Sequence, residues 1–184
     1  VARASLHFWE EPCISGEMGS GAVFFSGCAL HCVFCQNENI ANGTAGKVIS
    51  TERLGEIFLE LQEKCANNIN LVTPGQFVPQ IIKAVELARN QNLKIPIVYN
   101  TSSYENVDTI RSLEGIVDIY LPDFKYFDTA LSAKYSHAPD YPAVAKAVIA
   151  EMVRQTGAAV FENGEDSLMK RGTIVRHLIL PGRT

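Results

Sequence analysis

The feature that most constrains the fold of this chain is a regular alternation of short apolar runs with amphipathic segments. Five apolar runs are predicted to be strands, at residues 21–27, 68–74, 95–101, 115–124 and 173–182. Four segments between them are predicted to be helices, at residues 50–65, 78–92, 104–114 and 141–157. Strands that alternate with helices pair in parallel through right-handed crossovers. The sequence therefore predicts an α/β protein with a parallel sheet.

The predicted helix at residues 50–65 illustrates the pattern. Leu54, Ile57, Phe58 and Leu61 recur at the three- and four-residue spacing that places side chains on one face of a helix. Ser50 and Thr51 open this segment and are both candidate N-caps of the helix.

Two parallel architectures fit this order of elements: a doubly wound sheet, and a partial or complete (β/α) barrel. No Gly-x-Gly-x-x-Gly motif follows the first predicted strand, which disfavours dinucleotide binding. Both architectures place functional groups at the carboxyl ends of the strands. Polar or special residues follow the predicted strands and should share one rim, namely Cys28, Thr73, Pro74, Gly75, Asn100, Thr101, Ser102, Asp123 and Lys125. Such residues also commonly end strands, so each has a purely structural interpretation as well.

The composition limits the classes of partner. The chain has 184 residues, a net charge of −4 and no block of lysine or arginine, so we expect neither nucleic acid nor a membrane surface as a partner. It has no apolar run near the ~20 residues that span a bilayer, and its first residues lack a signal-peptide layout. We expect a single domain in the cytoplasm.

Three of the five cysteines, Cys28, Cys32 and Cys35, lie within the stretch GCALHCVFCQN. An odd number of cysteines with three in one cluster favours a reducing compartment and metal or redox chemistry over disulfides. Spacings of four and three would also place the thiols on one face of a helix, so three buried helical cysteines are an alternative. Gly27 precedes the three cysteines and the stretch directly follows a predicted strand, which favours a loop over a helix for the cysteine segment.

If a metal is bound, three thiolates so close in sequence would be ligands of one centre. A closed zinc or iron–sulfur site takes four protein ligands, and Cys13, Cys65 or His31 would supply the fourth. An open fourth position would instead let a substrate atom bind the metal directly.

The pattern Cys-x-x-x-Cys-x-x-Cys after the first strand, with Phe34 before the last cysteine, resembles the signature of radical S-adenosylmethionine enzymes. The stretches FFSGCALHCVFCQN, LPDFKYFD and VRHLILPG are most similar to the pyruvate formate-lyase activating enzyme and its uncharacterised relatives. The resemblance implies a partial (β/α) TIM-like barrel of parallel strands, truncated after about the fifth strand. Residues 1–184 would form one core domain, with a lead-in at 1–20 and the barrel at 21–184, and the chain would be a fragment.

The resemblance also implies the cofactors and the reaction. Cys28, Cys32 and Cys35 would hold a 4Fe-4S cluster whose fourth iron is chelated by S-adenosylmethionine. Reductive cleavage of that cofactor would give a 5′-deoxyadenosyl radical, which abstracts a hydrogen atom. An electron donor of the flavodoxin or ferredoxin type would reduce the cluster, and in an activating enzyme the substrate would be a glycyl-radical protein.

Further residues would bind S-adenosylmethionine by the same resemblance. The backbone near Phe34 would meet the adenine. Thr73, Pro74 and Gly75 occupy the place of the Gly-Gly-Glu motif, although the stretch LVTPGQ has one glycine and no glutamate.

Four polar residues from later strands complete the expected cofactor site. Asn100 replaces an aspartate of the family. Asp123 and Lys125 match an Asp-Leu-Lys motif and would point into the barrel mouth, with a surface ion pair as the alternative. Arg176 interrupts an apolar run and would lie near the cofactor carboxylate, whereas His177 would face the other way.

Two hypotheses from other classes remain. The chain could be a non-enzymatic iron–sulfur electron carrier or structural metal module, with Cys13 as the fourth ligand. It could also be a degenerate barrel kept as a binding partner, in line with the departures from the family motif at Thr73–Gly75.

Overall fold

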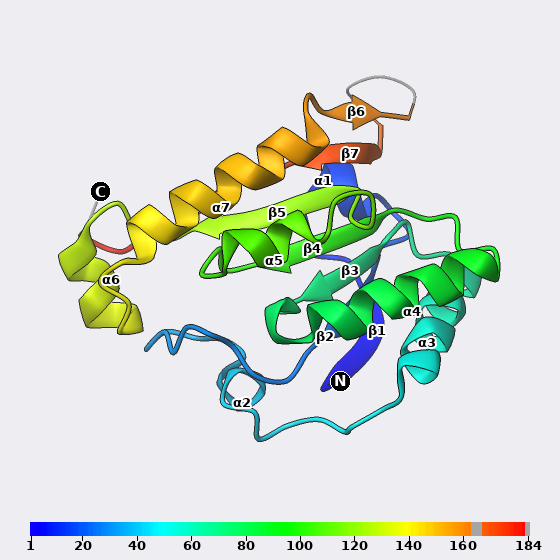
Figure 1. Cartoon of the computed structure of the whole chain (residues 1–184), viewed down its shortest axis with the longest axis horizontal. Coiled ribbons are helices and arrows are strands. Elements are labelled where there is room, and N and C mark those ends of the chain that lie inside the picture. The colour runs from blue at the N-terminus through cyan, green and yellow to red at the C-terminus, as the bar shows by residue number, and fades with distance from the viewer. Residues whose placement is uncertain (163–166, 183–184) are drawn as a thin grey trace.

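The computed structural model describes residues 1–162 and 167–182 of the chain. Its strands form one open sheet in the order β1-β2-β3-β4-β5-β7-β6, and β8 pairs with β5 (Figure 1). The β2–β3, β3–β4, β4–β5, β5–β7 and β5–β8 pairs are parallel, whereas β1 and β6 are antiparallel to their neighbours. The strands are β1 Arg3–His7, β2 Ser20–Phe24, β3 Ile69–Val72, β4 Ile97–Thr101, β5 Ile119–Phe124, β6 Val160–Phe161, β7 Met169–Thr173 and β8 Arg176–His177.

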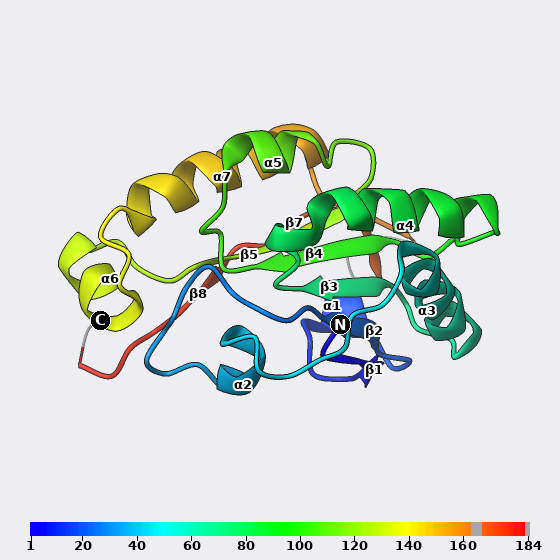
Figure 2. The same ribbon diagram turned by 60° about the horizontal axis from the view of Figure 1, so that its bottom comes forward.

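The helices lie mainly on one face of the sheet, where Figure 2 shows α4, α5 and α7 side by side. The main apolar core fills the space between this face and the helices, and it includes Phe58, Leu71, Ile81, Tyr99 and Val148. The helical elements are α1 Pro12–Ser15, α2 Glu38–Ala41, α3 Thr51–Glu63, the 3₁₀ turn η1 Gly75–Phe77, α4 Val78–Asn90, α5 Val107–Arg111, α6 Thr129–Ser136 and α7 Tyr141–Thr156.

The opposite face of the sheet is packed by the lead-in segment. Ile14 of α1 is buried against Val98, Ile119 and Leu121, which alternate along β4 and β5 with residues of the main core. Asn68 donates a hydrogen bond of 3.0 Å from its amide to the carbonyl of Ile14 and so holds α1 in place. The inner surface of this open sheet is therefore filled at its amino-terminal end by residues before β2.

The predicted alternation of strands and helices is confirmed, and the sheet is mostly parallel as predicted. The first four predicted strands correspond to β2, β3, β4 and β5, and the four predicted helices to α3, α4, α5 and α7. The sheet is not closed into a barrel, which agrees with a partial TIM-like fold.

The fifth predicted strand, residues 173–182, is wrong in its extent. The chain pairs with β5 first as β7 and again as β8, with a break between Thr173 and Arg176. The break lies opposite Pro122 of β5, which has no N–H to donate to a neighbouring strand. No strand extends past His177 within the described residues, although Leu178–Leu180 are apolar.

In the part of the chain that the structure describes, no helix has the length and apolar character needed to cross a membrane.

Candidate functional site

The three clustered cysteines lie on a loop that follows β2 directly. Residues 28–35 contain no helix, so the alternative of three cysteines on one helical face is wrong. All three thiols are free and partly buried. Cys28 and Cys32 pack against an apolar cluster beneath α6 and α7, which includes Leu30, Phe124 and Tyr141. The loop is thus held against the body of the protein with its thiols partly accessible.

The electrostatics of the loop indicate that the three thiols are neighbours. Burial raises the pKa of the Cys28 thiol, and the charges of Cys32 and Cys35 raise it further, while the Lys125 ammonium opposes them. Cys35 also donates its backbone N–H to the carbonyl of Cys32 at 3.0 Å. Three mutually repelling thiolates need a positive centre between them.

The donor set of the loop consists of three thiols, the ligand type that holds iron–sulfur clusters. Among residues 1–162 and 167–182, no group of three or more His, Cys, Asp or Glu side chains is arranged to hold one metal ion. The thiolates of a 4Fe-4S cluster bind different irons, so they lie farther apart than the ligands of one ion. Three partly buried thiols on one loop supply the ligand type that such a cluster requires.

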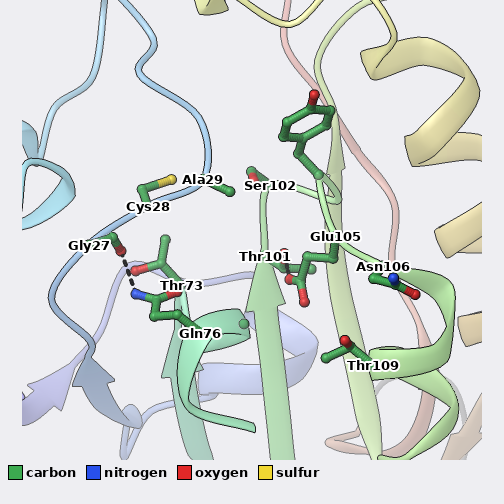
Figure 3. Close-up of a pocket in the computed structure, with 12 residues that line it drawn as sticks. Gly27, Cys28, Ala29, Thr73, Gln76, Thr101, Ser102, Glu105, Asn106 and Thr109 are labelled. Atoms are coloured by element: carbon green, nitrogen blue, oxygen red, sulfur yellow. Dashed lines mark hydrogen bonds between the residues drawn. The ribbon is translucent and has the colours of Figure 1, made fainter.

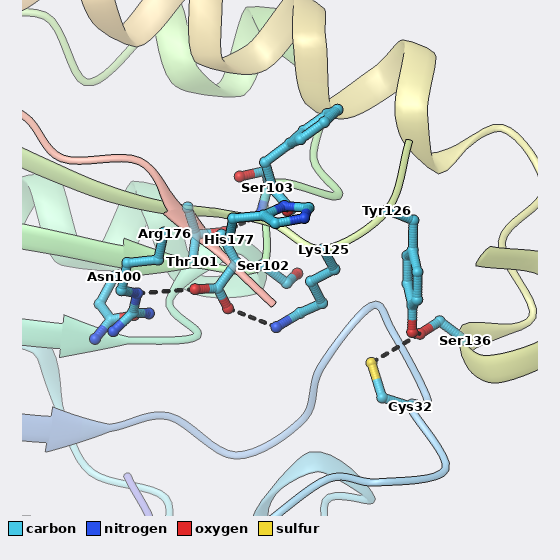
Figure 4. A network of polar contacts seen from close by, with 12 residues as sticks. Cys32, Asn100, Thr101, Ser102, Ser103, Lys125, Tyr126, Ser136, Arg176 and His177 are labelled. Atoms are coloured by element: carbon cyan, nitrogen blue, oxygen red, sulfur yellow. Dashed lines mark hydrogen bonds and ion pairs between the residues drawn. The ribbon is translucent and has the colours of Figure 1, made fainter. Parts of the chain in front are cut away.

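Cys32 has a polar partner that the sequence did not single out. Ser136, at the end of α6, donates its hydroxyl to the Cys32 sulfur at 2.9 Å, and the Tyr126 hydroxyl lies 2.7 Å from the same Ser136 oxygen (Figure 4). Hydrogen bonds to a cluster sulfur ligand tune its reduction potential. Asp128 caps α6 by accepting from the N–H of Ala130, and this cap was the available sequence signal for the helix.

Four predicted polar residues come together at the carboxyl ends of β4, β5 and β8 (Figure 4). Asp123 accepts a hydrogen bond from Lys125 Nζ at 2.5 Å and another from Arg176 Nε at 2.8 Å. Arg176 also donates through Nη2 to the Asn100 side-chain oxygen at 2.6 Å. Asn100, Asp123, Lys125 and Arg176 therefore form one network, which we call the rim network.

The lead-in segment contributes two carboxylates to Arg176. Its Nη1 lies 3.5 Å from Glu10 Oε2 and 3.8 Å from Glu11 Oε1. Burial raises the pKa of Glu10, and Arg176 partly offsets this effect. Sequence reasoning missed both glutamates because they lie more than 160 residues from Arg176.

Tyr141 ties the rim network to the helices. Its buried hydroxyl accepts from the Lys125 N–H at 2.9 Å and lies 2.8 Å from the Asp123 carbonyl and 2.9 Å from the Ser102 carbonyl. The residue opens α7, so a helix N-terminus fixes the backbone that carries Asp123 and Lys125.

A cavity of about 430 Å³ opens beside Cys28, above the ends of β3 and β4 (Figure 3). Its walls include Gly27, Thr73, Gly75, Gln76, Ser102 and Glu105. Glu105 accepts a hydrogen bond of 2.6 Å from the Tyr99 hydroxyl and another from Thr101, and burial raises its pKa. A Cβ on Gly75 would lie 2.8 Å from Glu105 Oε2, so a larger residue here would require the carboxylate to shift.

The remaining predicted residues have the following positions. Thr73 adopts a positive φ of 52°, and its hydroxyl donates to the carbonyl of Phe25. Pro74 is buried, and its neighbour Gly75 lines the cavity. Phe34 lies 6.5 Å from the ring of Tyr126.

Two other predictions concern residues outside the rim network. His177 turns away from Arg176 and lies 2.6 Å from the Phe124 carbonyl. Cys13 packs beside Ile14 on the inner face of the sheet, in a different apolar cluster from Cys28 and Cys32. This position gives no support to Cys13 as a fourth ligand.

Comparison with known proteins identifies the family. The uncharacterized protein MJ0674 of Methanocaldococcus jannaschii is 26% identical over 183 residues, which cover 96% of this chain and 48% of that protein. The chain thus spans about half the length of this relative. The sequence profile of the Radical SAM superfamily, whose members use a 4Fe-4S cluster and S-adenosylmethionine, matches residues 22–164. These residues include the three clustered cysteines, the cavity and most of the rim network, and the chain belongs to the radical SAM superfamily.

Proposed function

We propose that this protein is a radical S-adenosylmethionine enzyme in which Cys28, Cys32 and Cys35 hold the 4Fe-4S cluster. The observation that carries the proposal is the set of three free, partly buried thiols on the loop after β2, close enough for their charges to raise the pKa of Cys28. When bound, the cluster and S-adenosylmethionine supply a one-electron cleavage that yields a 5′-deoxyadenosyl radical for hydrogen abstraction.

The chain's own residues prepare the site for a charged cluster and cofactor. The Lys125 ammonium partly offsets the effect of burial, which raises the pKa of Cys28, and so favours the thiolate needed for iron binding. Ser136 donates a hydrogen bond to Cys32, which would stabilise negative charge on that sulfur. The cavity beside Cys28 offers space for a ligand at the carboxyl ends of β3 and β4.

Binding of S-adenosylmethionine by the predicted residues is part of the proposal. The rim network of Asn100, Asp123, Lys125 and Arg176 offers both charges to the carboxylate and ammonium groups of the methionyl part. Thr73 and Gly75 line the cavity, Pro74 lies between them, and the backbone of these three residues would bind the cofactor. The backbone near Phe34 would meet the adenine. Binding in a defined orientation would account for the contribution of these residues to catalysis.

The reaction subtype rests on a narrower resemblance. The stretches around the three cysteines, LPDFKYFD and VRHLILPG favour an activating enzyme similar to that of pyruvate formate-lyase. The partner would then be a glycyl-radical protein, and the electron donor would be a flavodoxin or ferredoxin. Electron paramagnetic resonance of a candidate partner after incubation with the loaded enzyme tests this subtype by the appearance of a glycyl radical.

Anaerobic reconstitution with iron and sulfide, followed by dithionite and S-adenosylmethionine, tests the main proposal. We expect one cluster per chain and formation of 5′-deoxyadenosine. Alanine at Cys28, Cys32 or Cys35 should abolish cluster binding, whereas alanine at the exposed Cys65 should leave it intact.

Two outcomes would contradict the proposal. The first is a cluster-loaded wild-type protein that releases no 5′-deoxyadenosine. The second is loss of the cluster in Cys13→Ala, which would favour the electron-carrier hypothesis with four protein ligands.

A further inference from the structure

The loop that carries Cys28 is tied to the segment after β3 through consecutive backbone carbonyls. The Thr73 hydroxyl donates to the Phe25 carbonyl at 3.2 Å. The Gln76 side-chain amide donates to the Gly27 carbonyl at 2.8 Å (Figure 3). It also donates to the Ser26 carbonyl at 2.8 Å. Gln76 thus uses both N–H bonds of one nitrogen on the two residues directly before Cys28.

Gly27 is suited to this contact in two ways. Its φ of +94° is a conformation that residues with a side chain rarely adopt. A Cβ at this position would also lie 3.2 Å from the Gln76 side-chain nitrogen. The turn before Cys28 therefore has a backbone shape and a free space that match the amide of Gln76.

The other side of the same turn is fixed by the segment after Cys35. Gly27 donates its N–H to the Ile40 carbonyl at 2.8 Å, and the Ser26 hydroxyl donates to the Ala45 carbonyl. These contacts belong to the cysteine loop and its continuation, so they move with the loop. Gln76 and Thr73, in contrast, connect the turn to the end of a central strand.

We propose that Gln76 is a positioning residue that fixes the backbone before Cys28 and thereby the direction of the Cys28 thiol. We call its two hydrogen bonds to the Ser26 and Gly27 carbonyls the clamp. The effect of Gln76 on the cluster rests on the proposed function, whereas the clamp itself does not. A side-chain amide is needed because two carbonyls must each receive an N–H from one atom. A glutamate of the same length would place a carboxylate against two carbonyl oxygens.

Amide hydrogen exchange of the cluster-free protein tests the clamp without any cluster. In Gln76→Ala and Gln76→Glu, exchange in residues 25–31 should be about tenfold faster, as expected from the loss of two neutral hydrogen bonds. Exchange in β4 should stay at the wild-type rate. Gln76→Lys keeps an N–H donor and should lie between wild type and Gln76→Ala.

Gln80→Glu is the matched control for the change in charge. Gln80 is exposed in the first turn of α4, four residues after Gln76. Its exchange pattern should equal that of the wild type. Wild-type exchange at residues 25–31 in both Gln76→Ala and Gln76→Glu would overturn the proposal, and so would acceleration spread evenly over the whole sheet.

A second measurement links the clamp to the cluster. In the reconstituted protein, Gln76→Ala and Gln76→Glu should lose iron to a ferrous chelator about tenfold faster than wild type. Wild-type iron loss in both variants would overturn the role in positioning Cys28. If the wild-type protein takes up no cluster at all, the proposed function fails. Hydrogen exchange of the cluster-free protein still tests whether Gln76 holds the loop.

Discussion

At the scale of single residues, Glu105 is a carboxyl group that lines the cavity and is held in a buried environment. Burial raises its pKa above the ordinary value of 4.5, although Tyr99 and Thr101 both donate hydrogen bonds to it. The folded protein therefore binds more protons at Glu105 than the unfolded chain does, between pH 4.5 and the raised pKa. In that window this group lowers the free energy of unfolding as pH increases.

Replacing Glu105 by glutamine should remove this contribution. Urea unfolding at several pH values from 4.5 upward should show that wild type loses stability relative to Glu105→Gln as pH rises. Glu86→Gln, on the exposed face of α4, should follow the wild-type curve. A constant difference between wild type and Glu105→Gln across this range would show that the pKa of Glu105 is not raised.

The sequence could single out candidate site residues where these residues lie close together in a short motif. The three cysteines lie within eight positions, and Asp123 and Lys125 are two apart, so spacing predicted that the members of each set lie close together. Glu105 and Gln76 could not be found this way. Their roles depend on contacts with Gly75 and with Ser26 and Gly27, which only the paired ends of neighbouring strands bring close.

At the scale of elements, α1 is a four-residue helix whose importance comes from one buried side chain. Ile14 is 2% exposed and fills the inner face of the sheet between β4 and β5. Ile14→Ala should lower the free energy of unfolding by about 3 kcal/mol, because truncation leaves a cavity that the strands cannot close. Val48→Ala, at a fully exposed site, should change it little.

Chemical denaturation of both variants measures this difference. A loss well below 1 kcal/mol for Ile14→Ala would mean that α1 is not packed against the sheet. The sequence predicted the central strands and long helices because their apolar periodicity is regular. It did not predict β1 or α1, because RASLH and PCIS lack the run of several apolar residues that marks the central strands.

At the scale of the whole molecule, Arg176 connects parts of the chain that are far apart in sequence. It bonds to Asn100 of β4 and Asp123 of β5, and it reaches Glu10 and Glu11 before α1. The order of strands predicts neither these contacts of Arg176 nor the position of the lead-in. Side-chain partners across an open sheet depend on the strand register and on the residues that pack against its inner face. Arg176 therefore couples the lead-in to the carboxyl-terminal end of the sheet.

Arg176→Met should destabilise the fold most at high pH. The substitution removes the guanidinium that the carboxylates of Glu10, Glu11 and Asp123 share, and leaves Lys125 paired with Asp123. We expect a loss of about 2 kcal/mol at pH 8, reduced from the value for fully buried pairs because Arg176 is partly exposed.

The loss should shrink at pH 5, because burial already raises the pKa of Glu10 and removal of Arg176 raises it further, so the carboxylate takes up a proton and the repulsion falls. Urea unfolding at both pH values measures the effect. Arg53→Met, which removes an exposed ion pair on α3, should show a small loss with little difference between pH 5 and pH 8. Equal losses for Arg176→Met at the two pH values would mean that Arg176 acts by packing and not as the counter-charge that joins the lead-in to the rim network.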